Sequence, residues 1–138
     1  MRASVLTVFV AGIALFAVAA PIFAHHSFSA EFDSKQTVKL IGSVTKVEWQ
    51  NPHAYFYIDV KDEKTGKVVN WACEMGSPNG LTGQGWTRNT LKLGMVVSVE
   101  GFQAKDGRNI ANARNVTVDG VRLGAASSSE NQATGQRQ

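Results

Sequence analysis

Three histidines are the residues of this chain best suited to chemistry. His25 and His26 are adjacent, and His53 follows Pro52 in a turn. Neutral imidazole is the commonest metal ligand near physiological pH. If the chain is cleaved after Ala24, the free α-amine and the ring Nδ1 of His25 can chelate one ion together, and His26 and His53 would complete a nitrogen site. Such a site suits copper first and zinc second.

Each histidine also has a simpler explanation. His25 and His26 can be polar residues that a peptidase accepts at its cut, and His53 can cap a turn or bond to backbone. The set resembles in part the histidine brace of copper enzymes, in which an N-terminal histidine chelates the metal and a second histidine caps it. We predict no catalytic residue and rank an enzyme last, because the sequence shows no nucleophile elbow, phosphate loop or evident pair of carboxylates.

The first residues predict export. Arg2 precedes an uncharged apolar run over residues 5–20, which is shorter than the roughly 18 residues that a spanning helix needs. A cut after Ala24 leaves Ala24 at position −1 and Ile22 at position −3, which signal peptidases accept. We therefore predict that residues 1–24 are a signal peptide, that the protein is periplasmic or secreted, and that the mature chain does not span a membrane.

Charge and cysteine content narrow the classes of protein further. The formal charge of +3 at pH 7 includes Arg2, so the mature chain is only weakly basic and we expect no nucleic-acid partner. Cys73 is the only cysteine, so no disulfide can form within the chain. Cys73 and Met75 share one strand face and could supply soft ligands for Cu(I). Alternate apolar residues of a strand are typically core, and we interpret both as core residues.

Alternation of apolar and polar residues predicts an all-β fold. The expected strands cover residues 38–49, 54–60, 67–75, 95–104 and 110–118. A change of apolar phase near Gly42 predicts a bend in the first strand. The Gly-rich residues 76–85 are expected to be a loop, and residues 87–92 a short helix that begins at Thr87. Five strands with a helix between the third and fourth match a small OB-like Greek-key barrel, with another small barrel or sandwich as the alternative.

The composition divides the chain into four parts. After the signal peptide, residues 25–37 are polar apart from Phe28 and Phe32 and are expected to form an arm that lies on the domain through these two rings. Residues 38–123 form the expected barrel. Residues 124–138 contain no apolar residue larger than alanine and are expected to be a disordered tail.

A second candidate site is aromatic. Tyr55 and Tyr57 alternate with buried positions of the second strand and are expected to point outward, on the face where OB barrels often bind ligands. With Trp49 and Trp71 they would form a stacking surface for a small ligand or for a protein of the cell envelope. The alternative is a face that is solvated or covered by the arm. Glu74 is expected to face solvent.

Five stretches form a joined pattern that runs through the expected mature chain up to the tail. They are AHHSF at 24–28, VEWQNPHA at 47–54, NWA at 70–72, GWT at 85–87 and the segment 101–113. The pattern resembles a family of small exported bacterial proteins that is catalogued as a domain of unknown function. The resemblance implies a periplasmic protein with an OB-like barrel and implies no activity.

These observations predict an exported binding module that holds a transition metal, copper first, through its N-terminal histidines. A metal-free module that binds an envelope protein or a small ligand on its β surface is the alternative, and a copper-dependent enzyme is the second alternative. Substitution of His25 distinguishes the first two, because only the metal site needs that residue.

Overall fold

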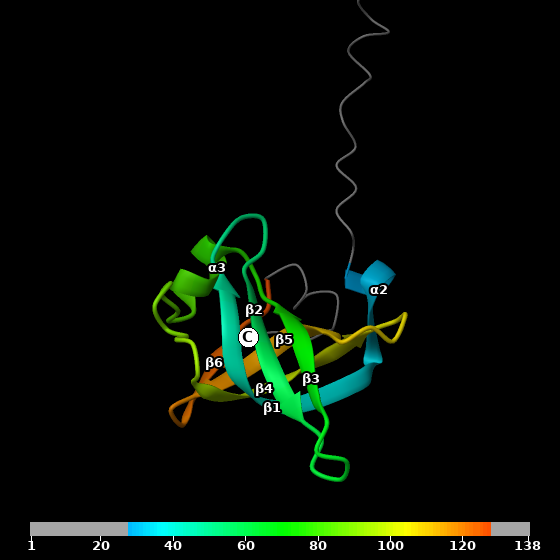
Figure 1. Cartoon of the computed structure of the whole chain (residues 1–138). Helices are drawn as coiled ribbons and strands as arrows, with labels where there is room; N and C mark the ends of the chain where they lie inside the picture. Colours follow the sequence, from blue (N-terminus) through cyan, green and yellow to red (C-terminus); the bar gives the residue numbers. More distant parts are fainter. Residues whose placement is uncertain (1–27, 128–138) are drawn as a thin grey trace, which may run out of the picture.

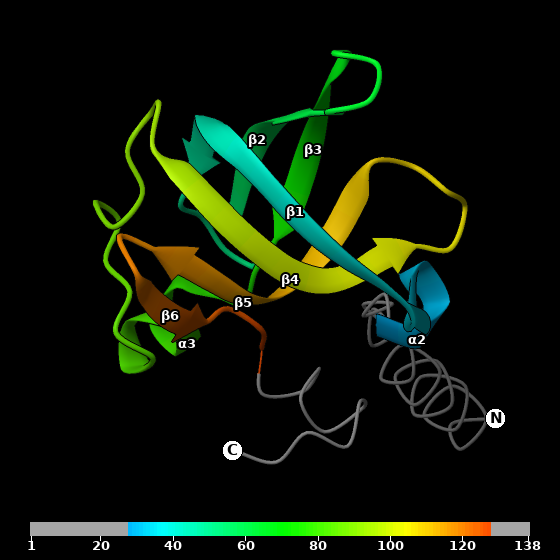
Figure 2. The same ribbon diagram turned by 90° about the horizontal axis from the view of Figure 1, so that it is seen from below.

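The computed structural model of the chain describes residues 28–127, which form one sheet that curls into a nearly closed ring (Figure 1, Figure 2). The elements in chain order are α2 (Phe28–Glu31), β1 (Phe32–Glu48), β2 (Tyr55–Lys61), β3 (Val68–Glu74), α3 (Pro78–Gly83), β4 (Val96–Ala104), β5 (Ile110–Val118) and β6 (Val121–Gly124). The strand order is β3-β2-β1-β4-β5-β6, and a parallel pairing of β3 with β5 closes the ring of the first five. The predicted all-β barrel with a short helix between β3 and β4 is confirmed, and β6 is an addition to the predicted strands.

Alternate side chains of the strands fill the ring and form the main core. Phe56 of β2 lies opposite Cys73 of β3, and both are fully buried. Met75 follows with no exposed surface. Burial raises the pKa of the Cys73 thiol to about 12. The interpretation of Cys73 and Met75 as core residues is therefore confirmed.

β1 serves both sides of the ring because it bends. It pairs with β4 as far as Ser43 and with β2 from Ser43 onward. The register with β2 shifts between Val44 and Lys46, and this bulge changes the apolar phase of the strand. Gly42 lies just before the bulge, where an added Cβ would stand 2.5 Å from the carbonyl oxygen of Asp59. Glycine is therefore needed where the backbones of β1 and β2 approach closely.

β1 begins at Phe32, earlier than the predicted start at residue 38, so part of the predicted arm belongs to the barrel. Phe32 is buried with Phe102 and Ala104 in a second, smaller core. The polar residues 33–36 follow it, in a stretch where the register with β4 shifts. That stretch does not alternate, and prediction of a strand depends on regular alternation.

The link between β3 and β4 holds its helix at a different place from the one predicted. α3 lies within the stretch that was expected to be a loop, whereas residues 87–92 form turns. Ser77 caps α3 through its side chain, and Pro78 occupies the first turn. Leu81 is fully buried and anchors the helix in the core. The Ser-Pro pair was the signal for this helix, and the glycines around it obscured that signal.

The domain extends past residue 123, so the predicted tail starts too early. Gly124 ends β6, and the next two residues, Ala125 and Ala126, are buried. The carbonyl of Ala125 accepts a hydrogen bond from the Gly76 N–H at 2.8 Å, and its N–H donates to the Arg114 carbonyl at 2.9 Å. Alanine fits where two backbones lie this close, and a search for large apolar residues misses such packing. The rest of the predicted tail, residues 128–138, lies outside the described residues.

Candidate functional site

His53 is held against a buried carboxylate at the open end of the β2–β3 pair. Its ring Nδ1 lies 2.5 Å from Oε1 of Glu74, the last residue of β3. The side chain of His53 is 35% exposed and that of Glu74 only 7%. Backbone bonds fix this geometry, because Ala54 donates to the Gly76 carbonyl at 3.0 Å and accepts from the Met75 N–H at 2.9 Å. The prediction that Glu74 faces solvent is therefore wrong, because its side chain is buried.

The contact with Glu74 decides which nitrogen of His53 is available. A carboxylate only accepts hydrogen bonds, so the Nδ1 of His53 carries the proton and donates it to Glu74. In the neutral ring, Nε2 then holds the free lone pair. The partly exposed ring thus presents a single oriented nitrogen donor.

Tyr55 shares the carboxylate of Glu74. The two residues face each other across the β2–β3 register, and the phenol hydroxyl is hydrogen-bonded to the Glu74 side chain. Burial raises the pKa of Tyr55 well above its ordinary value, with further contributions from the charge of Glu74 and from this hydrogen bond. The hydroxyl therefore remains protonated and acts as a donor. Glu74 accepts from both His53 and Tyr55.

The row of residues next to Glu74 is also polar and buried, although it lies outside the ring. Glu74 is opposite Asn112 of β5 in the parallel pairing, and Asn112 is opposite Phe102 of β4. Asn112 and Arg114 alternate with the core residue Ala113, which places both on the outer face. Both are nonetheless buried, and the guanidinium of Arg114 lies 5.7 Å from the centre of the Phe102 ring.

α2 covers part of this outer face and is attached at its apolar and polar sides. The ring of Phe28 contacts Phe32 and Phe102, at centroid distances of 5.8 and 5.6 Å. This contact agrees with the expectation that both phenylalanines lie on the domain. Lys105 donates from its backbone N–H to the Glu31 carbonyl at 2.9 Å.

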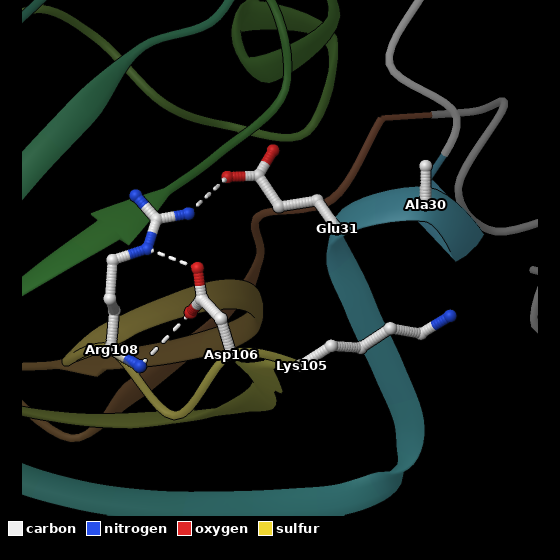
Figure 3. A pocket seen from close by; sticks show the side chains of 5 residues that line it. All are labelled: Ala30, Glu31, Lys105, Asp106 and Arg108. Carbon is white, nitrogen blue, oxygen red and sulfur yellow. Dashed lines mark hydrogen bonds and ion pairs between the residues drawn. The ribbon is translucent and has the colours of Figure 1, made fainter.

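Charged side chains complete this attachment around a pocket of about 350 Å³ beside α2 (Figure 3). The Lys105 ammonium donates to the carbonyl of Ser29 at 2.5 Å. Arg108 lies between two carboxylates, 2.5 Å from Asp106 and 3.6 Å from Glu31. The side chains of Arg108 and Asp106 are more than half exposed. Because these four charges are already paired or bonded within the domain, we assign this pocket the role of holding α2 in place.

The position of α2 determines where the preceding residues start. Glu31 lies close enough to Tyr55 for its charge to contribute to the raised pKa of that phenol. The chain therefore enters the described region on the side of the barrel that carries Glu74 and His53. His25 lies three residues before Phe28, and three extended residues span at most about 11 Å.

Two of the three predicted metal ligands, His25 and His26, lie outside the described residues. Of the predicted set, the structure places only His53. Within residues 28–127, no group of three His, Cys, Asp or Glu side chains is arranged to hold a metal ion. A metal site that includes His53 would therefore need donors from residues outside this range.

The predicted aromatic surface is divided between two environments. Tyr55 and Tyr57 alternate with the buried residues of β2, as predicted, and are partly buried. Tyr57 donates to Glu48 at 3.0 Å, and the Lys46 ammonium lies 5.2 Å from its ring centre. Trp49 and Trp71, the two tryptophans of the predicted surface, instead pack against the main core.

The buried polar residues of the outer face are the part of the site that the sequence analysis missed. Glu74 lies between two core residues, and Asn112 and Arg114 flank Ala113. Alternation assigns such residues to the outer face of a strand and to solvent. The only sequence signal for their burial is the pair of phenylalanines, Phe28 and Phe32, which pack with Phe102 beside Asn112.

The fold and this site define a small OB-like barrel domain that presents an oriented histidine on its outer surface. The chain belongs to DUF6152, a family of unknown function, whose model matches residues 13–113. The predicted resemblance to a family of unknown function agrees with this assignment. A search of curated proteins finds no significant match. Within residues 28–127, the helices are too short or too polar to cross a membrane.

Proposed function

We propose that this protein is an exported module that binds a transition-metal ion, copper first and zinc second, through His53 and the histidines of its mature N-terminus. The observation that carries the proposal is the hydrogen bond from Nδ1 of His53 to the buried Glu74. Histidines that ligate metals almost always donate their second ring nitrogen to a carboxylate, a backbone carbonyl or a water. That bond fixes both the tautomer and the orientation of the ring.

The energetics of Glu74 support this role. Burying a carboxylate is costly unless hydrogen bonds compensate for lost hydration. At this position the Nδ1–H of His53 is one of the donors to Glu74, and this bond leaves the imidazole Nε2 to bind another group. A histidine that only caps a turn needs no such buried partner.

The remaining donors are proposed to be His25 and His26. Cleavage after Ala24 would free the α-amine of His25, which with its ring nitrogen makes a chelate. The short chain length between His25 and α2 permits these groups to reach the side of the barrel that carries Glu74. The nitrogen-rich donor set is the reason for placing copper before zinc.

The metal-free interaction module has less support from the geometry. Trp49 and Trp71 pack against the core, and the hydroxyls of Tyr55 and Tyr57 are bonded to carboxylates. These residues therefore do not form one free stacking platform.

Calorimetry with Cu(II) and with Zn(II) tests the proposal on processed protein whose N-terminus is confirmed as His25 by mass spectrometry. We expect one equivalent of Cu(II) at sub-micromolar affinity, with loss of tight binding in H53A and in H25A. A variant with one alanine added before His25 keeps every side chain but moves the α-amine, and it should also bind weakly. Binding no tighter than that of a histidine-containing peptide would contradict the proposal, and the search would then turn to partners in the envelope.

A further inference from the structure

We propose that the outer face of β1 and β4 docks on membranes that contain anionic phospholipids. The docking surface, named the β1–β4 patch, comprises three exposed aliphatic residues and two lysines: Ile41, Leu93, Val96, Lys39 and Lys92. It contains no residue of the proposed metal site, so the inference stands apart from that proposal. Two features of the structure support it, namely a group of uncovered aliphatic side chains and cations that have no anionic partner in the described part of the chain.

The aliphatic residues of the β1–β4 patch lie close to one another. Ile41 of β1 and Val96 of β4 both point outward, because the residues beside them in each strand face the core. In the register of β1 with β4, Ile41 is opposite Ser98, two residues along β4 from Val96. The two aliphatic side chains are therefore diagonal neighbours. Leu93 lies three residues before Val96, in the turn that leads into β4.

These three side chains are exposed to a degree that is unusual for large aliphatic residues. Leu93 is 70% exposed, Val96 67% and Ile41 61%. In Figure 2, no described strand or helix lies over the middle of β1 and β4. A single exposed aliphatic residue is common, but a group of them marks a surface that contacts a protein or a membrane.

Cations accompany the aliphatic residues. Lys39 lies on the same face of β1 as Ile41, two residues earlier, and Lys92 directly precedes Leu93. Residues 75–99 contain two cations, Arg88 and Lys92, and no carboxylate. Within residues 28–127, no carboxylate lies at ion-pair distance from Lys39, Arg88 or Lys92.

The carboxylates near the β1–β4 patch do not cancel this charge. Glu100 faces Lys39 in the register but is paired with Arg122, whose guanidinium lies 2.5 Å from its carboxylate. Asp119 follows β5 by one residue, near the start of β4, and the unpaired cations outnumber it. The β1–β4 patch is therefore positively charged, and an anionic partner would complement it.

The residue types of the β1–β4 patch favour a lipid partner over a protein partner. Protein interfaces are enriched in aromatic residues, Met and Arg and are depleted in Lys. The β1–β4 patch instead combines lysines with Leu, Val and Ile. A lysine can lay its alkyl chain along hydrocarbon while its ammonium group binds a phosphate. A bilayer with anionic headgroups offers both the negative charge and the apolar phase that this surface lacks.

The chain also contains a matched control for the β1–β4 patch. Lys67 and Val68 are likewise a lysine followed by an exposed aliphatic residue, and Val68 is 55% exposed. Val68 lies at the hairpin end of β3, which is separated from β1 by β2. K67Q and V68S therefore make the same chemical changes as K92Q and L93S at a distance from the patch.

The experiment measures sedimentation of the processed protein with vesicles of equal parts phosphatidylglycerol and phosphatidylcholine, and with vesicles of phosphatidylcholine alone. We expect tighter binding to the anionic vesicles, and loss of this binding as NaCl rises from about 0.05 to about 0.5 M, because salt screens exposed charges. K92Q should weaken binding to the anionic vesicles about fivefold, the usual effect of one cation near such a surface. L93S should weaken it about tenfold through loss of apolar burial. K67Q and V68S should leave it unchanged.

Binding that falls in K92Q and L93S and persists in the two controls supports the proposal. Wild-type protein that binds neither kind of vesicle, or both kinds equally, overturns it, and so do equal losses in all four variants. A wild-type dimer in analytical ultracentrifugation that L93S dissociates, without vesicle binding, would make the patch an interface between copies and would also overturn it. If circular dichroism shows that L93S is unfolded, I41S replaces it, with the same expected direction.

Discussion

The attachment of α2 to the barrel should control both stability and metal binding, and F28A tests this. Phe28 is the apolar contact of α2, stacked on Phe32 and edge-on to Phe102. Truncating a fully buried phenylalanine costs about 3–5 kcal/mol. Because Phe28 is only partly buried, we expect about half of this, roughly 1.5–2.5 kcal/mol of unfolding free energy.

F28A should also weaken metal binding, because Phe28 is the first residue of α2, the short helix that precedes the barrel. Without the ring contact, Lys105 and Arg108 alone would hold α2 through bonds that are largely exposed. The N-terminal donors would then be connected to the barrel by a longer flexible segment, which lowers their effective concentration at His53. We expect Cu(II) affinity to fall about tenfold, by this loss of effective concentration.

Urea unfolding followed by tryptophan fluorescence and Cu(II) calorimetry provide the two measurements. V68A is the control, because Val68 is 55% exposed on β3 and should change stability by less than about 0.5 kcal/mol. A loss of stability in F28A with unchanged Cu(II) affinity would refute the link between α2 and the site. No change in either quantity would refute the packing of Phe28 itself.

Three further predictions concern the barrel. Cys73 should react with a thiol reagent only in denaturant, because burial raises its pKa to about 12; rapid labelling of the native protein at neutral pH would contradict this. G42A should lower the unfolding free energy measured in urea by about 1–3 kcal/mol, since the new Cβ would stand 2.5 Å from the Asp59 carbonyl oxygen, and a neutral effect would show that β1 can move aside. W86F should lower the melting temperature, because the Trp86 indole N–H donates to the Gly124 carbonyl at 2.7 Å, and loss of that bond together with indole packing costs about 1–3 kcal/mol. A melting temperature equal to that of the wild type would mean that Gly124 finds another donor.

The sequence predicted the ring of strands because the core-facing residues alternate regularly. β2 and β5 follow this rule: Phe56 and Ile58 alternate with tyrosines, and Ala111 and Ala113 alternate with polar residues. Such a pattern specifies which side chains face inward, and the inward faces of five strands then define one shared core. The order of elements along the chain, five strands with a helix between the third and fourth, then matched an OB-like barrel.

The site could be predicted only in part, since alternation gives no information about the outer face. Alternation placed Glu74 and Tyr55 on that outer face, and Glu74 was therefore expected to be in contact with solvent. Part of that face is covered by α2, whose Phe28 contacts Phe102. Residues 28–31 lack strand alternation, so they were not assigned to the barrel. The partner of His53 thus depends on tertiary packing that local patterns do not specify.

The burial of Glu74 is better explained by its effect on His53 than by stability. Ionic groups in protein interiors can often be replaced by apolar residues of similar volume with little loss of stability, or with a gain. An apolar residue at position 74 would satisfy packing between β2 and β5, but it would accept neither the Nδ1–H of His53 nor the hydroxyl of Tyr55. The imidazole would then be free to rotate or to change tautomer, and its Nε2 lone pair would no longer have a fixed direction. A carboxylate at this position therefore makes chemical sense when the outward nitrogen of His53 has a ligand to bind.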